Sequence, residues 1–216
     1  RTNSIPKFSN VIAAFRYHYF PFSFFCKFFN VLRSRRSEHL ANAFSFLSYD
    51  TVRNFEIWAS LPVASLLKTN GIVALWITNS PSIKSFATEQ LIRKWQLKLL
   101  ASWTWLKVNS VTRSGRPVCE FGGDESKKPF ETLLIAVKKV GSPSLRELPK
   151  ERLIISVPSA VPSRKPPLRE ILQPWLPKDF NCLELFARSL QPSTTSIGYE
   201  VLKMQNKAWF VPSTIH

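Results

Sequence analysis

The most regular feature of the chain is a series of short apolar runs separated by polar segments, which begins near residue 60. Residues Gly71–Thr78 (GIVALWIT) form a continuous apolar run with turn-forming residues at both ends. Such a run is typical of a strand that is buried on both faces of a parallel sheet. The polar stretch Asn79–Ser82 follows, and its serines favour a helix start, so we predict a helix over about 83–94.

Similar runs continue along the chain and alternate with helical patterns. A short helical pattern begins at Leu61 and stops at Asn70, and Lys165–Leu176 predicts a helix with prolines in its first turn, where a missing N–H costs little. Further strands are predicted at Leu97–Val108, Glu131–Lys139, Arg152–Pro158, Leu183–Ala187 and Tyr199–Gln205. This alternation, in a chain of 216 residues that suits one core, predicts an α/β domain with a mostly parallel sheet.

The first thirty residues differ from the rest. Residues Phe15–Phe29 contain nine aromatic side chains without a period of 2 or 3.6. Three interpretations stay open: a membrane-touching segment, an aromatic platform for nucleic acid, or a non-native peptide, since a pyrimidine-rich stretch before a splice acceptor translates into Phe, Ser and Pro. We therefore assign residues 1–30 as an atypical segment, non-native or disordered, and 31–216 as the domain. Because the chain starts with Arg1, we expect its true amino terminus to be missing.

The charge of the chain indicates the kind of partner. A formal net charge of +16 is typical of proteins that contact a polyanion, most often nucleic acid, or an anionic membrane surface. No apolar run is long enough to predict a membrane span. The cysteines Cys26, Cys119 and Cys182 lie far apart and form no CxxC, which argues against a zinc site or a disulfide framework and favours a reducing compartment.

Candidate chemistry is found where polar residues follow predicted strands. The sequence has no GxGxxG, P-loop, HExxH or GxSxG motif. Polar segments follow three strands, at Thr78–Ser80, Ser159–Lys165 and Arg188–Gln191. Each alone could be an ordinary loop, but the carboxyl ends of parallel strands meet at one edge, so together they predict a ligand crevice. Lys165, just before two prolines at the start of a predicted helix, is suited to a carboxylate or phosphate.

Six segments in order carry a family resemblance. They are GIVALWITNS, LLASWTWLKV, KKPFETLLIAVK, RLIISVPSAVPSRKPPLREIL, CLELFARSLQP and TSIGYEVLKMQ. Over about 61–205 the chain resembles the catalytic domain of the adenine-N6 methyltransferase family that includes the mRNA N6-methyladenosine writer, in the branch of methyltransferase-like protein 4. The resemblance implies a permuted Rossmann-like methyltransferase sheet, S-adenosylmethionine as cofactor, adenine in RNA or DNA as substrate, and a nuclear or cytosolic protein, alone or with a partner subunit.

The resemblance also implies roles for individual residues. Lys165 matches the lysine expected near the cofactor's methionine carboxylate, and Arg188 matches the arginine expected at its ribose. The motif expected over the ribose and adenine corresponds to Gly198, Tyr199 and Glu200. The candidates on the substrate side are Thr78, Asn79, Lys127, Lys128 and Glu131.

The catalytic signature of the family, Asp-Pro-Pro-Trp, does not occur in the printed sequence. It should fall a little before Val31, and we expect the strand that carries it to be absent or replaced, so the sheet is predicted to be incomplete at its amino terminus. Asn54–Ser60 is expected to be extra sequence. No catalytic residue is assigned, and this form is predicted to be inactive; the alternative is a non-catalytic relative that binds nucleic acid or scaffolds a partner.

Overall fold

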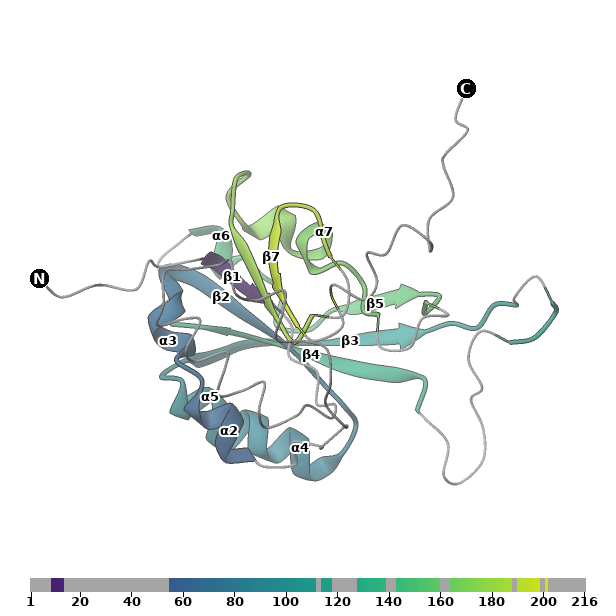
Figure 1. Ribbon diagram of the computed structural model, residues 1–216, viewed down its shortest axis with the longest axis horizontal. Coiled ribbons are helices and arrows are strands. Elements are labelled where there is room, and N and C mark those ends of the chain that lie inside the picture. The colour runs from purple at the N-terminus through teal and green to yellow at the C-terminus, as the bar shows by residue number, and fades with distance from the viewer. Residues whose placement is uncertain are drawn as a thin grey trace, which may run out of the picture.

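The computed structural model of the chain describes the backbone of residues 9–13 and, further on, residues 55–111, 114–117, 128–138, 143–159, 164–187, 190–198 and 201 (Figure 1). These residues form an α/β domain around one sheet of seven strands in the order β5-β3-β4-β2-β1-β6-β7. The strands are β1 Ser9–Ala13, β2 Leu67–Ile77, β3 Lys98–Lys107, β4 Phe130–Val137, β5 Leu153–Ser156, β6 Cys182–Leu185 and β7 Thr194–Ile197.

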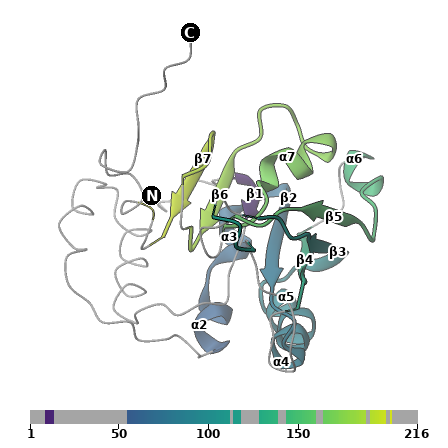
Figure 2. The same cartoon turned by 90° about the vertical axis from the view of Figure 1, so that its right-hand side faces the viewer.

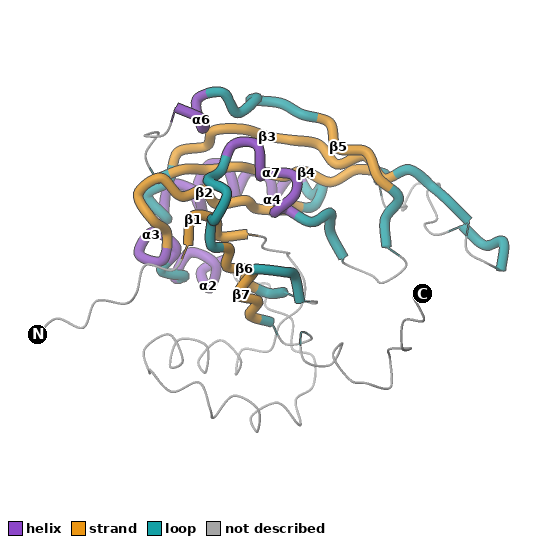
Figure 3. The backbone as a smooth tube through the Cα atoms, turned by 90° about the horizontal axis from the view of Figure 1, so that it is seen from above, coloured by secondary structure: helices purple, strands orange, loops and turns teal. Residues whose placement is uncertain are grey.

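The direction of one strand, β4, departs from the parallel arrangement. It pairs antiparallel with both of its neighbours, β2 and β3, whereas the other pairs of strands are parallel. The start of β4 therefore lies at the same edge of the sheet as the carboxyl ends of the other six strands. The α/β class is confirmed, and the mixed, curled sheet agrees with the Rossmann-like methyltransferase fold (Figure 3).

Helices cover both faces of the sheet (Figure 2). One face carries α2 Phe55–Ser60, α3 Val63–Leu66, α4 Pro81–Ser85, the π-helical η3 Phe86–Leu91 and α5 Ile92–Lys94. The other face carries α6 Pro143–Arg146, α7 Leu168–Leu172 and the 3₁₀ helix η4 Gln173–Trp175. The predicted helix over 83–94 is confirmed as the run from α4 to α5.

Burial on both sides explains the continuous apolar run in β2. Val73, Leu75 and Ile77 pack into one core cluster with Leu91 and Trp95 from the helices. The intervening side chains pack into the second cluster; these are Ile72, Ala74 and Trp76. Each fully buried large side chain of this kind contributes about 1.5–3 kcal/mol relative to exposure.

Several boundaries differ from those predicted. The helix predicted up to Asn70 ends at Leu66, and β2 begins at Leu67, because pairing with β1 extends the strand. The helix predicted from Lys165 begins only at Leu168. The strand β7 was not predicted, and the strand predicted at 199–205 falls on residues outside the described ones, apart from Val201 in a turn.

Most of the segment expected to be extra sequence, Asn54–Ser60, is helical. Residues Phe55–Ser60 form helix α2, and Trp58 is buried. The backbone carbonyl of Trp58 accepts a hydrogen bond of 3.1 Å from the indole of Trp95. The ring centre of Trp58 lies 4.7 Å from that of Phe186. Helix α2 thus contributes Trp58 to the core, and the expectation that this segment is extra sequence relative to the family stays a prediction.

The first thirty residues contain a strand of the sheet. β1 lies between β2 and β6 and is parallel to both; Val11 is in register with Ile72 on one side and with Cys182 on the other. The strand expected before Val31 was predicted to be absent or replaced; five residues of this segment form a strand at a central position in the sheet, without the Asp-Pro-Pro-Trp motif. The assignment of the other residues of 1–30 as an atypical segment stays a prediction.

Candidate functional site

The strand order predicts where a ligand would bind. From β1 the chain continues to β2 on one side, whereas β6 and β7 lie on the other side of β1. In open α/β sheets, ligands bind outside the carboxyl ends of the strands at such a reversal of order. The relevant edge is therefore the one at which β1, β2, β3 and β6 end and β4 begins.

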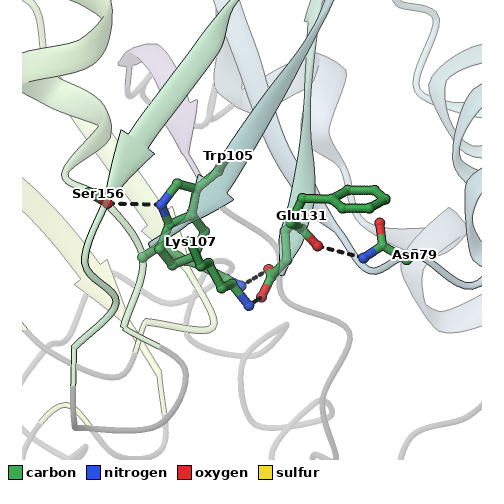
Figure 4. A network of polar contacts seen from close by, with 7 residues as sticks. Asn79, Trp105, Lys107, Glu131 and Ser156 are labelled. Carbon is green, nitrogen blue, oxygen red and sulfur yellow. Dashed lines mark hydrogen bonds and ion pairs between the residues drawn. The ribbon is translucent and has the colours of Figure 1, made fainter. Parts of the chain in front are cut away.

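The reversed strand β4 brings residues from distant parts of the chain together at this edge (Figure 4). Asn79, two residues after β2, donates a hydrogen bond from its side-chain amide to the carbonyl of Phe130. At the end of β3, the backbone N–H of Lys107 donates to the carbonyl of Pro129 over 2.7 Å. These two contacts fix the start of β4 between the ends of β2 and β3.

Three charged side chains form the centre of this arrangement, which we call the Lys107–Glu131–Lys165 triad. The ammonium of Lys107 lies 2.6 Å from Oε1 of Glu131, and that of Lys165 contacts Oε2. The side chains are only 14%, 11% and 11% exposed, respectively. A carboxylate that is this buried is stable as an anion only when cations or hydrogen bonds compensate its charge.

Aromatic rings support both lysines of the triad. The ammonium of Lys165 lies 5.9 Å from the ring centre of Trp76 and 5.4 Å from that of Trp105, and Lys107 lies 5.0 Å from the latter. Cations at such distances are attracted to the ring faces. The indole N–H of Trp105 donates to the hydroxyl of Ser156 over 2.8 Å, so the ring orientation is fixed. The indole nitrogen of Trp76 is buried without a hydrogen-bond partner among the described residues.

On the other side of β1, the ends of β6 and β7 approach each other closely. The N–H of Ala187 donates to the carbonyl of Ile197 over 2.9 Å. A Cβ atom placed on Gly198 would lie 1.8 Å from the carbonyl oxygen of Ala187, so no larger residue fits there without a backbone shift. Phe186 has φ of 60°, a left-handed conformation that is strained for a bulky residue and that often marks functional segments.

Two polar side chains lie near this end of the sheet. Glu184 of β6 is in register with Ser196 of β7, so the two project from the same face. Desolvation by burial raises the pKa of the Glu184 carboxyl from 4.5 to about 7. The hydroxyl of Ser196 is buried without a hydrogen-bond partner in the described part of the chain. Burial also raises the pKa of the neighbouring Cys182 thiol to about 11, so this cysteine is not a reactive thiolate at neutral pH.

The structure brings some of the predicted site residues together. Asn79, Glu131 and Lys165 meet at the edge described above. Thr78 directly follows β2 and is half-buried, whereas Lys128 is exposed and outside the triad. Gly198 lies at the end of β7. Lys127, Arg188, Tyr199 and Glu200 fall outside the described residues, and their roles stay predictions.

Sequence reasoning missed Lys107, Trp105 and Ser156. A usable signal was present, because Lys107 is the last residue but one of a predicted strand, and the polar residues Asn109 and Ser110 follow that strand. The pattern could not show that β4 runs in the opposite direction, and only this direction places Glu131 beside Lys107. Within the residues that the structure describes, no three His, Cys, Asp or Glu side chains gather as a metal site, and no helix has the length and apolarity to cross a membrane.

Comparison with known proteins gives a consistent picture. The family model described as MT-A70 matches residues 30–200. The chain is 34% identical over 184 residues to the mouse N(6)-adenine-specific methyltransferase METTL4, covering 82% of this chain and 37% of that protein. It is 39% identical over 157 residues to a DNA N6-methyl methyltransferase of Caenorhabditis elegans, covering 72% of this chain and 41% of that protein.

A relative from Pyricularia oryzae is named for RNA. The chain is 35% identical over 156 residues to the N6-methyladenosine RNA methyltransferase MTA1 of Pyricularia oryzae, covering 71% of this chain and 40% of that protein. The chain thus spans about two fifths of the length of these curated relatives.

Proposed function

Because the chain belongs to the MT-A70 family, we propose that it is an S-adenosylmethionine-binding N6-adenine methyltransferase domain that in this form does not transfer the methyl group. The observation that carries the proposal is the buried ammonium of Lys165 at the carboxyl edge, held on Trp76 and Trp105. When bound, S-adenosylmethionine supplies an electrophilic methyl group. The protein must hold the charged and polar ends of this cofactor so that the methyl group lies beside the acceptor base.

The described residues fit the amino-acid end of this cofactor. Its carboxylate requires a cation, and Lys165 offers one that is largely removed from water, where a charge-assisted hydrogen bond is strong. The residues proposed for the ribose and adenine are Arg188, Tyr199 and Glu200, beside Gly198. Support for these four comes from the resemblance of the sequence, and for Gly198 also from its close contact with Ala187.

Adenine in nucleic acid is the proposed acceptor. The net charge of +16 supports a polyanionic substrate, since lysine and arginine contacts to phosphates supply most of the affinity in such complexes. Enzymes that modify a base must also present it outside the stack. The names of the relatives include both a DNA and an RNA methyltransferase, so the proposal covers both substrates. The proposed nuclear or cytosolic location rests on the resemblance of the sequence alone.

We base the proposed lack of methyl transfer on the residues that follow β1 in the sequence. In the sheet, β1 lies beside β6, so a carboxylate just after β1 would stand close to a cofactor at the end of β6. The residues that follow are Ala14, Phe15, Arg16 and Tyr17, and Asp-Pro-Pro-Trp does not occur in the printed sequence. The chain therefore offers no acid there to accept a hydrogen bond from the adenine amino group.

Calorimetry on the full 216-residue chain tests the cofactor assignment. We expect S-adenosylmethionine to bind and Lys165→Met to weaken binding about 10-fold or more, the loss typical of a buried charged hydrogen bond. The matched control is Lys138→Met, at the opposite end of β4, where the exposed ammonium contacts the carbonyl of Ala64. Absence of binding by the parent chain, or an equal loss in the control, would contradict the assignment.

A second experiment tests the transfer step. With tritiated S-adenosylmethionine and adenine-containing RNA and DNA oligonucleotides, we expect no incorporation above background. Incorporation that depends on Lys165 would contradict the proposed inactivity. The lack of Asp-Pro-Pro-Trp also favours a second candidate, a non-catalytic relative that binds nucleic acid or scaffolds a partner. That candidate predicts binding of oligonucleotides without any binding of S-adenosylmethionine.

A further inference from the structure

The two cations of the triad hold one carboxylate from opposite sides. Oε1 of Glu131 is bound by Lys107 and Oε2 by Lys165, and all three side chains are largely buried. Any anion that engages Lys165 competes with Oε2 for the same ammonium. The cost of that competition depends on how well Glu131 remains compensated when Lys165 turns away, since a buried carboxylate that loses its cation is strongly unfavourable.

The two lysines differ in how firmly their backbones are held. Lys107 is the last residue of β3; its N–H donates to Pro129, and it is in register with Ser156 of β5. Lys165 lies ahead of α7, in the stretch 164–167 that has no regular secondary structure. Lys107 is therefore the fixed partner of Glu131, and Lys165 is the partner that can shift toward a ligand.

We propose that Lys107 is a positioning residue of this site, which keeps the charge of Glu131 compensated while Lys165 engages the carboxylate of an amino-acid-bearing nucleoside. The identity of this ligand as the methyl donor rests on the proposed function. Lys107 itself does not contact the ligand in this arrangement. Lys107 affects the affinity only through Glu131. Its substitution should therefore weaken only ligands that carry the carboxylate, and only while Glu131 is present.

The experiment measures calorimetric binding of two ligands to the full chain. S-adenosylhomocysteine carries the amino-acid carboxylate, and 5′-methylthioadenosine is the same nucleoside without it. We expect Lys107→Met to weaken binding of S-adenosylhomocysteine by about 10-fold, a typical coupling between sites, and to leave binding of 5′-methylthioadenosine unchanged. Lys107→Arg, which keeps the charge and can still reach Oε1, should restore most of the affinity.

A double-mutant cycle separates the indirect route from a direct contact. Glu131→Gln removes the competing charge, so it should bind S-adenosylhomocysteine at least as tightly as the parent. In the Glu131→Gln background, Lys107→Met should have no further effect on either ligand. If Lys107→Met does not fold, Lys107→Gln, which keeps a donor but no charge, replaces it and should show a loss in the same direction.

The outcomes are distinguishable. An equal loss for both ligands, no loss for either, or a loss that persists in the Glu131→Gln background would overturn the role of Lys107 and leave the proposed function standing. A parent chain that binds neither ligand would overturn both, because no nucleoside site would then exist. A parent that binds 5′-methylthioadenosine as tightly as S-adenosylhomocysteine would overturn the engagement of the carboxylate by Lys165, and with it the role of Lys107, while a nucleoside site would still exist.

Discussion

The glutamates Glu131, which is buried, and Glu184, which is half-buried, stand on strands of one sheet on opposite sides of β1. Glu131, at the start of β4, has two lysine ammonium groups on its carboxylate. The carboxyl of Glu184, in β6, has no hydrogen bond or ion pair with a described side chain, and burial raises its pKa to about 7. The protein thus stabilises the charge of Glu131 with two cations, whereas the carboxyl of Glu184 changes its charge near neutral pH.

The difference shows that burial alone does not determine the state of an acidic side chain. Desolvation disfavours the charged form in both places, and a nearby cation reverses this effect only where the strands supply one. The β3–β4 side of the edge is therefore a region of fixed charges, whereas the β6–β7 side holds a group whose charge changes near neutral pH. The expected outcomes below test this contrast, beginning with the largest effect.

The largest effect is expected when Glu131 is deprived of both cations. The double variant Lys107→Met/Lys165→Met leaves a buried carboxylate without these partners and should lower the free energy of unfolding by about 3–5 kcal/mol. Urea denaturation at pH 7 measures the change. The matched control is a triple variant with Glu131→Leu added, which should recover most of the loss. A double variant as stable as the parent would mean that the triad does not compensate Glu131.

The next effect is a fall in stability with rising pH caused by Glu184. A carboxyl whose folded pKa is about 7, above its ordinary value of 4.5, stabilises the fold fully only below about pH 4.5, and this contribution is lost as the pH rises through 7. The loss amounts to at most about 3 kcal/mol. Urea denaturation between pH 5 and 8 measures the free energies of unfolding of the parent and of Glu184→Gln. The two should diverge, because the variant gains stability relative to the parent as the pH rises. Parallel curves would contradict the raised pKa.

The smallest effect contrasts two serines on the two sides. Ser156 accepts a hydrogen bond from the indole of Trp105, so Ser156→Ala should destabilise the protein by about 1 kcal/mol. The hydroxyl of Ser196 is buried without a partner among the described residues, so Ser196→Ala should be neutral or stabilising by up to about 1 kcal/mol. Thermal unfolding measures the change in stability of each variant. If both variants lost stability, the two serines would not differ as proposed.

Much of the sheet could be predicted from the sequence. The strands β2, β3, β4 and β6 are apolar runs bounded by polar or turn residues, so their existence was predictable even where their ends were not. The meeting of Asn79 and Lys165 at one edge followed from the rule that polar residues after parallel strands lie together, whereas Glu131 was a candidate only through the family resemblance. The β2 boundary was misjudged because pairing with β1 extends it through Lys68 and Asn70, which are not typical strand residues.

The remaining features depend on tertiary contacts that no local pattern contains. Residues 9–13 (SNVIA) hold only three apolar residues beside an aromatic-rich segment, and their strand conformation depends on pairing with β2 and β6 on both sides. Likewise, Thr194–Ile197 has two threonines and a serine, and it forms β7 by pairing with β6. The direction of β4 leaves no trace in its composition, so the meeting of Lys107 with Glu131 could not be foreseen.

The reversal of β4 has a consequence for engineering. The connection between β3 and β4 leaves the sheet after Lys107 and returns at Phe130, and both ends are tied to each other by the bond from Lys107 to Pro129 and by the pairing of Leu106 with Phe130. Because the entropy of closing a loop grows slowly with its length, the span between these anchors can be shortened, lengthened or exchanged at small energetic cost. The structure therefore provides an insertion point beside the site, where a new recognition module can be grafted without altering the strand register.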